Sequence, residues 1–226
     1  MIGAIHMTNR TRSEILKNSL LAVAGLLLFG LGVHLTIQAN IGAAPWDAFS
    51  LGLSSTFGMS FGNAAVLVSF LVVGIDLLLR EKIGIGMILD AVIVGKTVDF
   101  LNWTGLIPQM HSPIAGAIFM VLGMTVSGFS QAIYMRAALG CGPRDTLLVG
   151  LSRRLDRLPI GAVSICIQAT VALAGFLLGG PIGLGTLMYV LLQGPIMQAA
   201  FTLVRFDAKA VQHQDILESA RIIAGK

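Results

Sequence analysis

Five ionisable side chains lie inside strongly apolar segments of this 226-residue chain: His34 in one segment, Asp76 in a second, and Asp90, Lys96 and Asp99 in a third. Asp76 lies near the cytoplasmic end of its segment beside Arg80, so the other four are the stronger candidates. A charged group at the centre of a bilayer is costly, so such residues usually face a cavity or a partner and mark function. The spacing of Lys96 and Asp99 places both on one face of a helix, where they can form an ion pair. These residues are the first candidates for chemistry.

We expect His34, Lys96 and Asp99 to share a layer, because His34 and Asp99 both lie about 7 Å below the outer ends of their helices at α-helical rise. The cluster would bind substrate or relay protons, with Asp90 lower on the route to the cytoplasm. The alternative is an ion pair that only holds helices together. Substrate binding predicts a water-accessible cavity near His34 and Lys96, whereas a scaffold would pack dry there.

A second candidate is the motif G-x-x-P-x-D, which occurs twice. Its fixed residues are Gly42, Pro45 and Asp47 in one copy and Gly140, Pro143 and Asp145 in the other. Proline suits the first helical position because it has no N–H to leave unpaired, and the helix dipole favours a carboxylate in the first turn. Both copies therefore predict helix starts. A second interpretation is that the two aspartates bind a cation or a cationic substrate.

The helices that begin at these prolines, over 45–56 and 143–155, are too short to cross a bilayer, which takes roughly 20 residues. Each is expected to be either re-entrant or interfacial. Trp46 is interpreted as an interfacial aromatic and Arg144 as a cation that reaches the headgroups. Further arginines in the second copy favour a helix that rests on anionic headgroups.

The motif belongs to a longer internal repeat. Six of fourteen positions are identical between 41–54 and 139–152. Glycines recur at offsets of 98 or 99 residues, as Gly25/Gly123, Gly30/Gly128, Gly62/Gly161, Gly84/Gly183, Gly86/Gly185 and Gly95/Gly194. Shared proline, aspartate and glycine at one offset are not explained by apolar composition, so we predict two tandem repeats.

A hydrophobic fraction of 55% with only 12% charged residues indicates an integral membrane protein. Candidate spans are about 19–39, 61–79, 84–104, 113–135, 160–178 and 183–204. The predicted fold is all-α and polytopic, with six transmembrane helices as two inverted three-helix repeats, each with one short helix. The expected parts are a cytoplasmic segment 1–18, repeats at 19–104 and 113–204, and a cytoplasmic amphipathic tail at 205–226.

The basic residues set the predicted orientation. Fourteen of the fifteen lysines and arginines fall on the side that holds both termini, and the exception is Lys96. The positive-inside rule makes that side cytoplasmic. Because three spans is an odd number, the second repeat enters the membrane in the opposite sense to the first, a ground plan that recurs in secondary transporters. The two motif copies are then expected to face opposite sides of the membrane.

Sequence motifs of several enzyme classes are missing. The chain has no Walker lysine loop, no H-E-x-x-H, no G-x-S-x-G and no cluster of histidine and cysteine. Cys141 and Cys166 lack the spacing of a metal site. We therefore expect no enzyme activity, no cofactor, no metal site and no nucleic-acid partner; the expected partners are the lipid bilayer, a small polar solute and a second copy of the chain.

Several segments resemble a known family. They are Gly-Ala-Ala-Pro-Trp-Asp at 42–47, Gly-Leu-Ser at 52–54, Ser-Phe-Gly at 60–62 and Ile-Gly-Ile-Gly at 83–86. The pattern resembles the YczE/YyaS/YitT family of small bacterial integral membrane proteins, in particular its YczE-like branch, over about 19–204. The resemblance implies a protein of the bacterial inner membrane and carries no catalytic or binding residue across.

The function expected from these features is that of a small secondary transporter or permease-like protein, with a site at the repeat interface and a small polar or charged solute. Three spans per repeat suggest that a homodimer builds the pathway. The alternative is a membrane accessory protein whose basic segment at 136–159 docks a cytoplasmic partner. A membrane enzyme that acts on lipid is a third interpretation.

Overall fold

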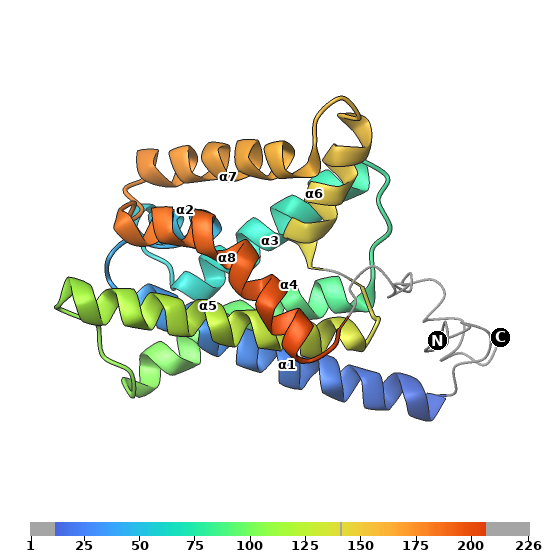
Figure 1. Ribbon diagram of the computed structural model, residues 1–226, viewed down its shortest axis with the longest axis horizontal. Helices are drawn as coiled ribbons and strands as arrows, with labels where there is room; N and C mark the ends of the chain where they lie inside the picture. Colours follow the sequence, from blue (N-terminus) through green and yellow to red (C-terminus); the bar gives the residue numbers. More distant parts are fainter. Residues whose placement is uncertain (1–11, 141, 207–226) are drawn as a thin grey trace.

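The computed structural model describes residues 12–140 and 142–206, and the regular structure in these ranges is helical. Most of the expected N-terminal segment and of the amphipathic tail, as well as Cys141, lie outside the described residues. The helices are α1 (Arg12–Gln38), α2 (Pro45–Phe57), α3 (Phe61–Leu78), α4 (Ile85–Thr104), α5 (Pro113–Arg136), α6 (Pro143–Arg154), α7 (Ile160–Leu177) and α8 (Leu184–Leu203). Figure 1 shows their arrangement.

Five of the described helices, α1, α3, α5, α7 and α8, are long and apolar enough to cross a membrane. The 20 residues of α4 are also sufficient in length. Its three charged residues, Asp90, Lys96 and Asp99, are spread along the helix, whereas the charged residues of α1 all lie in its first two turns. The predicted all-α, polytopic membrane fold is confirmed, and each predicted span coincides with a helix.

The short helices start where the motif predicts. Pro45 and Pro143 occupy the first turns of α2 and α6, and each is followed by an aspartate in the same turn. Helix α2 ends at Gly58, whose φ of 64° is left-handed. The next helix begins at once, because the Ser60 hydroxyl accepts a hydrogen bond from the amide of Asn63.

Helices α1 and α5 lie side by side in the lower part of the view in Figure 1. Their backbones approach closely at two glycines, since a Cβ added to Gly123 would lie 2.7 Å from the carbonyl oxygen of Gly32. Small residues permit this kind of contact between helices in membranes. Helix α4 packs on the flank of α1, and α8 packs on α5.

Each short helix packs against the other half of the chain: α2 lies on α7, and α6 lies on α3. Two backbone hydrogen bonds join the halves in the same way. The amide of Gly86 donates to the carbonyl of Leu139 over 2.8 Å, and the amide of Gly185 donates to the carbonyl of Ile41 over 2.7 Å. The two halves of the chain are therefore interlocked through equivalent contacts.

The glycines that open the motif are required by this crossing. Gly42 and Gly140 have φ values of 107° and 123°, which other residues rarely adopt. A Cβ on Gly42 would lie 2.6 Å from the amide nitrogen of Gly183, and one on Gly140 would lie 2.9 Å from Cα of Gly84. Each motif glycine thus permits close approach to the start of a helix from the other half.

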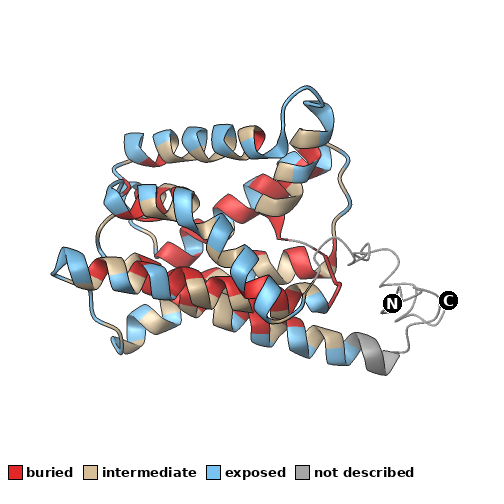
Figure 2. Ribbon diagram, viewed as in Figure 1, coloured by how far each residue is buried: buried red, intermediate tan, exposed pale blue. Residues whose placement is uncertain are grey.

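The two halves differ in one helix pair. Helix α3 packs along α4, but its counterpart α7 does not pack along α8 in the same way. About 50% of the apolar span in α3 is buried, against 11% in α7. Figure 2 shows α7 as a mainly exposed helix at the edge of the molecule. The space left beside α7 and α8 is part of the cavity described next.

Candidate functional site

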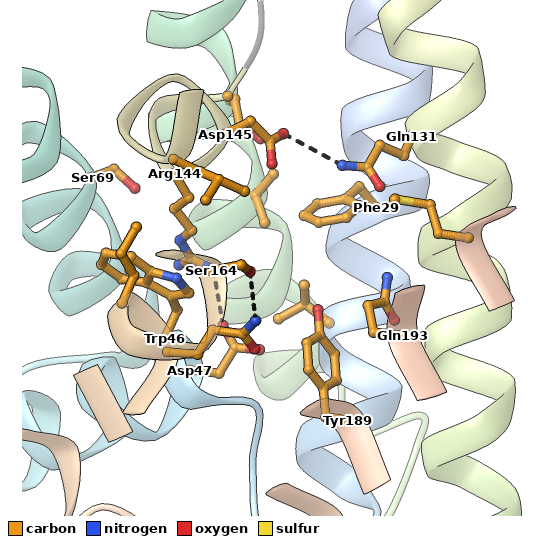
Figure 3. Close-up of a pocket in the computed structure, with 18 of the residues that line it drawn as sticks. Phe29, Trp46, Asp47, Ser69, Gln131, Arg144, Asp145, Ser164, Tyr189 and Gln193 are labelled. Atoms are coloured by element: carbon orange, nitrogen blue, oxygen red, sulfur yellow. Dashed lines mark hydrogen bonds and ion pairs between the residues drawn. The ribbon is translucent and has the colours of Figure 1, made fainter. Parts of the chain in front are cut away.

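A cavity of about 460 Å³ lies between the two halves, where the first turns of α2 and α6 meet. All eight helices contribute residues to its wall. Figure 3 shows Trp46 and Asp47 opposite Arg144 and Asp145, with Tyr189 and Gln193 of α8 on another side. The site therefore needs the complete fold and is built from residues far apart in the chain.

An ion pair in the cavity wall joins the two copies of the motif. Nη1 of Arg144 lies 3.5 Å from Oδ1 of Asp47, and the guanidinium lies 5.3 Å from the centre of the Trp46 ring. Asp47 is only 3% exposed, whereas the Arg144 side chain is 30% exposed. The guanidinium thus supplies both the counter-charge of a buried carboxylate and a cation–π contact.

The first turns of the two motif copies lie in one cavity, and entry of the two copies from opposite sides of the membrane stays a prediction. Pro45 and Pro143 are buried, and both helix starts open on one cavity. The expected contact of Arg144 with headgroups is wrong, because the buried carboxylate of Asp47 competes for the guanidinium. Trp46 likewise lines the cavity. The exchange of short helices between the halves brings the two copies together.

The C-terminal end of α6 carries Arg153 and Arg154, which are among the arginines from which the sequence predicts a helix resting on headgroups. Arg153 and Arg154 both contact Glu81, over 3.3 Å and 2.9 Å, and Arg154 also donates to the carbonyl of Leu79. The Glu81 side chain is largely buried by these contacts. Charge within the chain therefore holds this end of α6 to the loop between α3 and α4.

Asp145 occupies the same place in α6 as Asp47 in α2. Its Oδ2 accepts a long hydrogen bond of 3.4 Å from the amide of Gln131. The helix-start positions predicted for both aspartates are confirmed. The second interpretation is that the two aspartates bind a cation. Asp47 does contact a cation, but this cation is the side chain of Arg144 in the same chain.

Asp90 lines the cavity from α4. A Cβ added to Gly142 would lie 2.9 Å from its Oδ2, so the carboxylate borders the turn that opens α6. No hydrogen bond or ion pair joins Asp90 to another described residue. Of the four ionisable residues singled out in the sequence, Asp90 is the one that reaches this cavity.

The other three residues do not form the expected cluster. His34 is fully buried in α1, with Nε2 3.5 Å from Nε2 of Gln38, and its Nδ1 has no partner among the described residues. Lys96 is exposed and donates over 2.6 Å to Oδ1 of Asn63. The expected pairing of Lys96 with Asp99 is not found, and the cavity wall includes neither Lys96 nor His34.

Asp99 instead binds the start of α3. Its Oδ2 accepts from the Ser60 hydroxyl over 2.6 Å, and its Oδ1 accepts from the Gly62 amide over 2.7 Å. Free N–H groups at a helix start are strong partners for a carboxylate, and this explains why Asp99 turns away from Lys96. A role in substrate binding for His34, Lys96 or Asp99 stays a prediction.

Several residues of the cavity were missed in the sequence. Ser69, Gln131 and Gln193 are uncharged polar residues in largely apolar helices, and no local pattern distinguishes them from the other polar residues of those helices. Tyr189 did carry a signal, because it occupies the repeat position of Asp90, and both side chains line the cavity. Among the described residues, no group of three His, Cys, Asp or Glu side chains is arranged to hold a metal ion.

Comparison with known proteins gives a family without an assigned activity. Residues 16–201 match the model of a family of unknown function, DUF6198. The uncharacterized membrane protein YczE of Bacillus subtilis is 33% identical over 177 residues, which cover 77% of this chain and 81% of YczE. The uncharacterized protein YyaS of the same organism is 30% identical over 185 residues, which cover 80% of this chain and 90% of YyaS.

A further relative is an uncharacterized protein of Haemophilus influenzae, 30% identical over 173 residues that cover 76% of this chain and 78% of the relative. No solved structure matches the chain significantly. The expected resemblance to YczE and YyaS is confirmed. The chain is a multi-pass membrane protein that belongs to the DUF6198 family and is homologous to the bacterial membrane protein YczE.

Proposed function

We propose that this protein is a small secondary transporter of the bacterial inner membrane, which moves a small polar or charged solute by alternating access. In this proposal α4 is the sixth span, both termini are cytoplasmic, and the two halves are inverted repeats with α2 and α6 as re-entrant helices. Equivalent contacts on the two sides of the molecule support the inverted arrangement, which is common in transporters. The cavity between the halves is the solute site.

The observation that carries the proposal is a pair of equivalent glycine contacts, one closed and one open. Gly62 of α3 and Gly95 of α4 touch backbone to backbone, since a Cβ added to Gly95 would lie 2.8 Å from the carbonyl oxygen of Gly62. Their repeat equivalents are Gly161 of α7 and Gly194 of α8. A Cβ added to either of these would have no atom within 4 Å.

The closed pair is also fastened by side chains. Asp99 of α4 accepts hydrogen bonds from Ser60 and Gly62 at the start of α3. The equivalent positions in the second half are Pro159 and Gln198, and no hydrogen bond joins them. One side of the cavity is therefore sealed, and the equivalent side is open, as expected of one state in an alternating cycle.

The predicted orientation places these two sides across the membrane. With a cytoplasmic N-terminus, the contact of Gly62 with Gly95 lies in the outer half, and the gap between Gly161 and Gly194 lies in the cytoplasmic half. The structure then corresponds to an inward-open state. Closing α7 onto α8 while α3 leaves α4 would carry the cavity to the other side.

An accessory protein that docks a partner through the basic segment at 136–159 is less well supported. Arg153 and Arg154 in that segment are already held by Glu81. A packed scaffold would also need no cavity of about 460 Å³ with charged residues in its wall. A homodimer is not needed for this pathway, because the helices of one chain surround the cavity.

Alternating access can be tested without knowing the solute. Gln193 lines the cavity, so Gln193→Cys, in a background with Cys141→Ser and Cys166→Ser, reports which side of the membrane reaches the site. A membrane-impermeant thiol reagent is applied to inside-out and right-side-out vesicles. We expect reaction from both sides, faster from the cytoplasmic side. The control is Asp156→Cys in the exposed loop before α7, which should react from the cytoplasmic side alone; a Gln193→Cys variant that behaves like this control would contradict transport.

A further inference from the structure

We propose that the cavity binds a small organic monocation, such as a protonated amine or a guanidinium compound, with Asp90 as its carboxylate contact. The inference names the substrate class of the site and rests on the proposed transport function for its role in the cell. Binding itself does not require transport, so the two proposals can fail separately.

The charge of the cavity wall favours a cation. Among the described residues that line it, three are carboxylates, Asp47, Asp90 and Asp145, and one is a cation, Arg144. Two helix starts add about half a positive charge each. The positive contributions therefore amount to about two charges against three negative ones. One further positive charge would complete the balance.

The excess negative charge is located at Asp90. Asp47 has both Arg144 and the start of α2, and Asp145 has both Gln131 and the start of α6. Asp90 comes from the interior of α4. Its carboxylate borders the turn that opens α6, but that helix start already has Asp145 in its first turn, and no described residue forms a hydrogen bond or ion pair with Asp90. A cation in the cavity would supply the missing counter-charge.

The wall is also suited to the organic part of such a ligand. Phe29, Trp46 and Tyr189 present aromatic rings to the cavity (Figure 3). Cations bind favourably over aromatic faces, and the Arg144 guanidinium already does so over Trp46. The cavity thus stabilises one planar cation between a ring and a carboxylate. A volume of about 460 Å³ is in the range of small-ligand sites.

A polar group without a partner points to a ligand as well. Ser69 lines the cavity and is only 7% exposed. Oε1 of Gln193, on the facing helix α8, is buried without a partner. A buried hydroxyl or amide left unsatisfied costs free energy. An ammonium or guanidinium group would supply a donor for Oε1 of Gln193.

An anion is less suited to this site, although helix starts commonly bind anions. The guanidinium of Arg144 is occupied by Asp47. Each helix start already has a carboxylate in its first turn, Asp47 in α2 and Asp145 in α6. An anion would have to displace these groups and lie near Asp90, whereas a cation joins three carboxylates.

The test uses Trp46 as a fluorescent reporter. The chain has two tryptophans, and Trp103 is 82% exposed, so Trp103→Phe leaves Trp46 in the wall as the single fluorophore. The full-length variant in lipid nanodiscs is titrated with 2-phenylethylammonium, with neutral 2-phenylethanol and with anionic 3-phenylpropionate. We expect a saturable change in Trp46 emission for the ammonium compound, with at least tenfold weaker responses to the other two.

Two substitutions locate the binding. Asp90→Asn should weaken the apparent affinity for 2-phenylethylammonium at least tenfold, while Asp156→Asn in the exposed loop makes the same chemical change and should leave it unaltered. Arg144→Met should strengthen binding, because it releases the carboxylate of Asp47. Gel filtration and thermal denaturation establish that each variant is folded.

Three results would overturn the proposal: tighter binding of 3-phenylpropionate, no saturable response to 2-phenylethylammonium, or equal affinity in Asp90→Asn and Asp156→Asn. If the ammonium compound binds but Gln193→Cys reacts from one side only, the binding site is supported and transport is contradicted. If Gln193→Cys reacts from both sides but the ammonium compound does not bind, transport is supported and this substrate class is contradicted.

Discussion

Arg144 lies 3.5 Å from Asp47, although 97 positions separate them in the chain. Each belongs to one copy of the same motif. The first copy buries the carboxylate of Asp47, and the second copy supplies its counter-charge through Arg144. The copies differ at this position, where Trp46 stands in one and Arg144 in the other, and these two side chains contact each other. The motif is therefore one composite site formed by two helix starts.

Arg144→Met is expected to destabilise the protein by about 2 kcal/mol. Removing one partner leaves the carboxylate of Asp47 buried without its counter-charge, and the 30% exposure of Arg144 moderates the cost. Unfolding free energies in detergent give the value. In a double-mutant cycle with Asp47→Asn, the double variant should be more stable than the sum of the single effects predicts, by about 1 kcal/mol. Strict additivity would show that the pair does not interact energetically.

Alanine at equivalent glycines should have unequal effects. Gly62→Ala places a methyl group against the carbonyl of Gly95 and the carboxylate of Asp99, and such overpacking typically costs about 1–3 kcal/mol. Gly161→Ala, its match in the second half, meets no atom within 4 Å and should leave stability nearly unchanged. Thermal midpoints in detergent compare the two. Equal losses would mean that the α7–α8 side is packed as tightly as the α3–α4 side.

Asp99 and Lys96, three residues apart, should differ strongly in importance for stability. Asp99→Ala removes two hydrogen bonds to a charged acceptor and leaves the Gly62 amide without that partner, a loss of about 2–3 kcal/mol. Lys96→Met removes a contact between exposed side chains and should change the thermal midpoint little. A large effect of Lys96→Met on stability would instead support the ion pair expected from their spacing.

The elements of this fold follow closely from local sequence, whereas the site does not. Apolar runs and the prolines at 45 and 143 predict the helices because both act within a few residues. The spacing of Lys96 and Asp99 predicted an ion pair, but the free amide of Gly62 lies in another helix and offers a better partner. The partnership of Arg144 with Asp47 depends on the exchange of short helices between the halves. No local pattern encodes that exchange.

Part of the site was nevertheless present in the repeat. The aligned glycines Gly62/Gly161 and Gly95/Gly194 mark the helix pairs that differ between the halves. Asp90 was singled out because a carboxylate in an apolar segment is rare. What the sequence lacked was the direction of each helix start, which decides whether a polar residue faces lipid, a neighbouring helix or the cavity.

The central claim is that α7 and α8 can adopt the contact that α3 and α4 now make. In the closed pair, Oγ of Ser60 lies 2.6 Å from Oδ2 of Asp99. Closing the second half would bring the equivalent positions 159 and 198 equally near. The decisive measurement is therefore cross-linking of Pro159→Cys with Gln198→Cys by a methylene-bridged bis-methanethiosulfonate, in membranes and in the background with Cys141→Ser and Cys166→Ser.

The control pair Ser60→Cys with Asp99→Cys should cross-link in the conformation described. We predict that Pro159→Cys with Gln198→Cys also cross-links, and that adding Gly161→Leu, which fits the open gap but obstructs closure, suppresses this product alone. If the pair at 159 and 198 never cross-links under conditions that join 60 and 99, α7 does not close on α8, and alternating access is wrong.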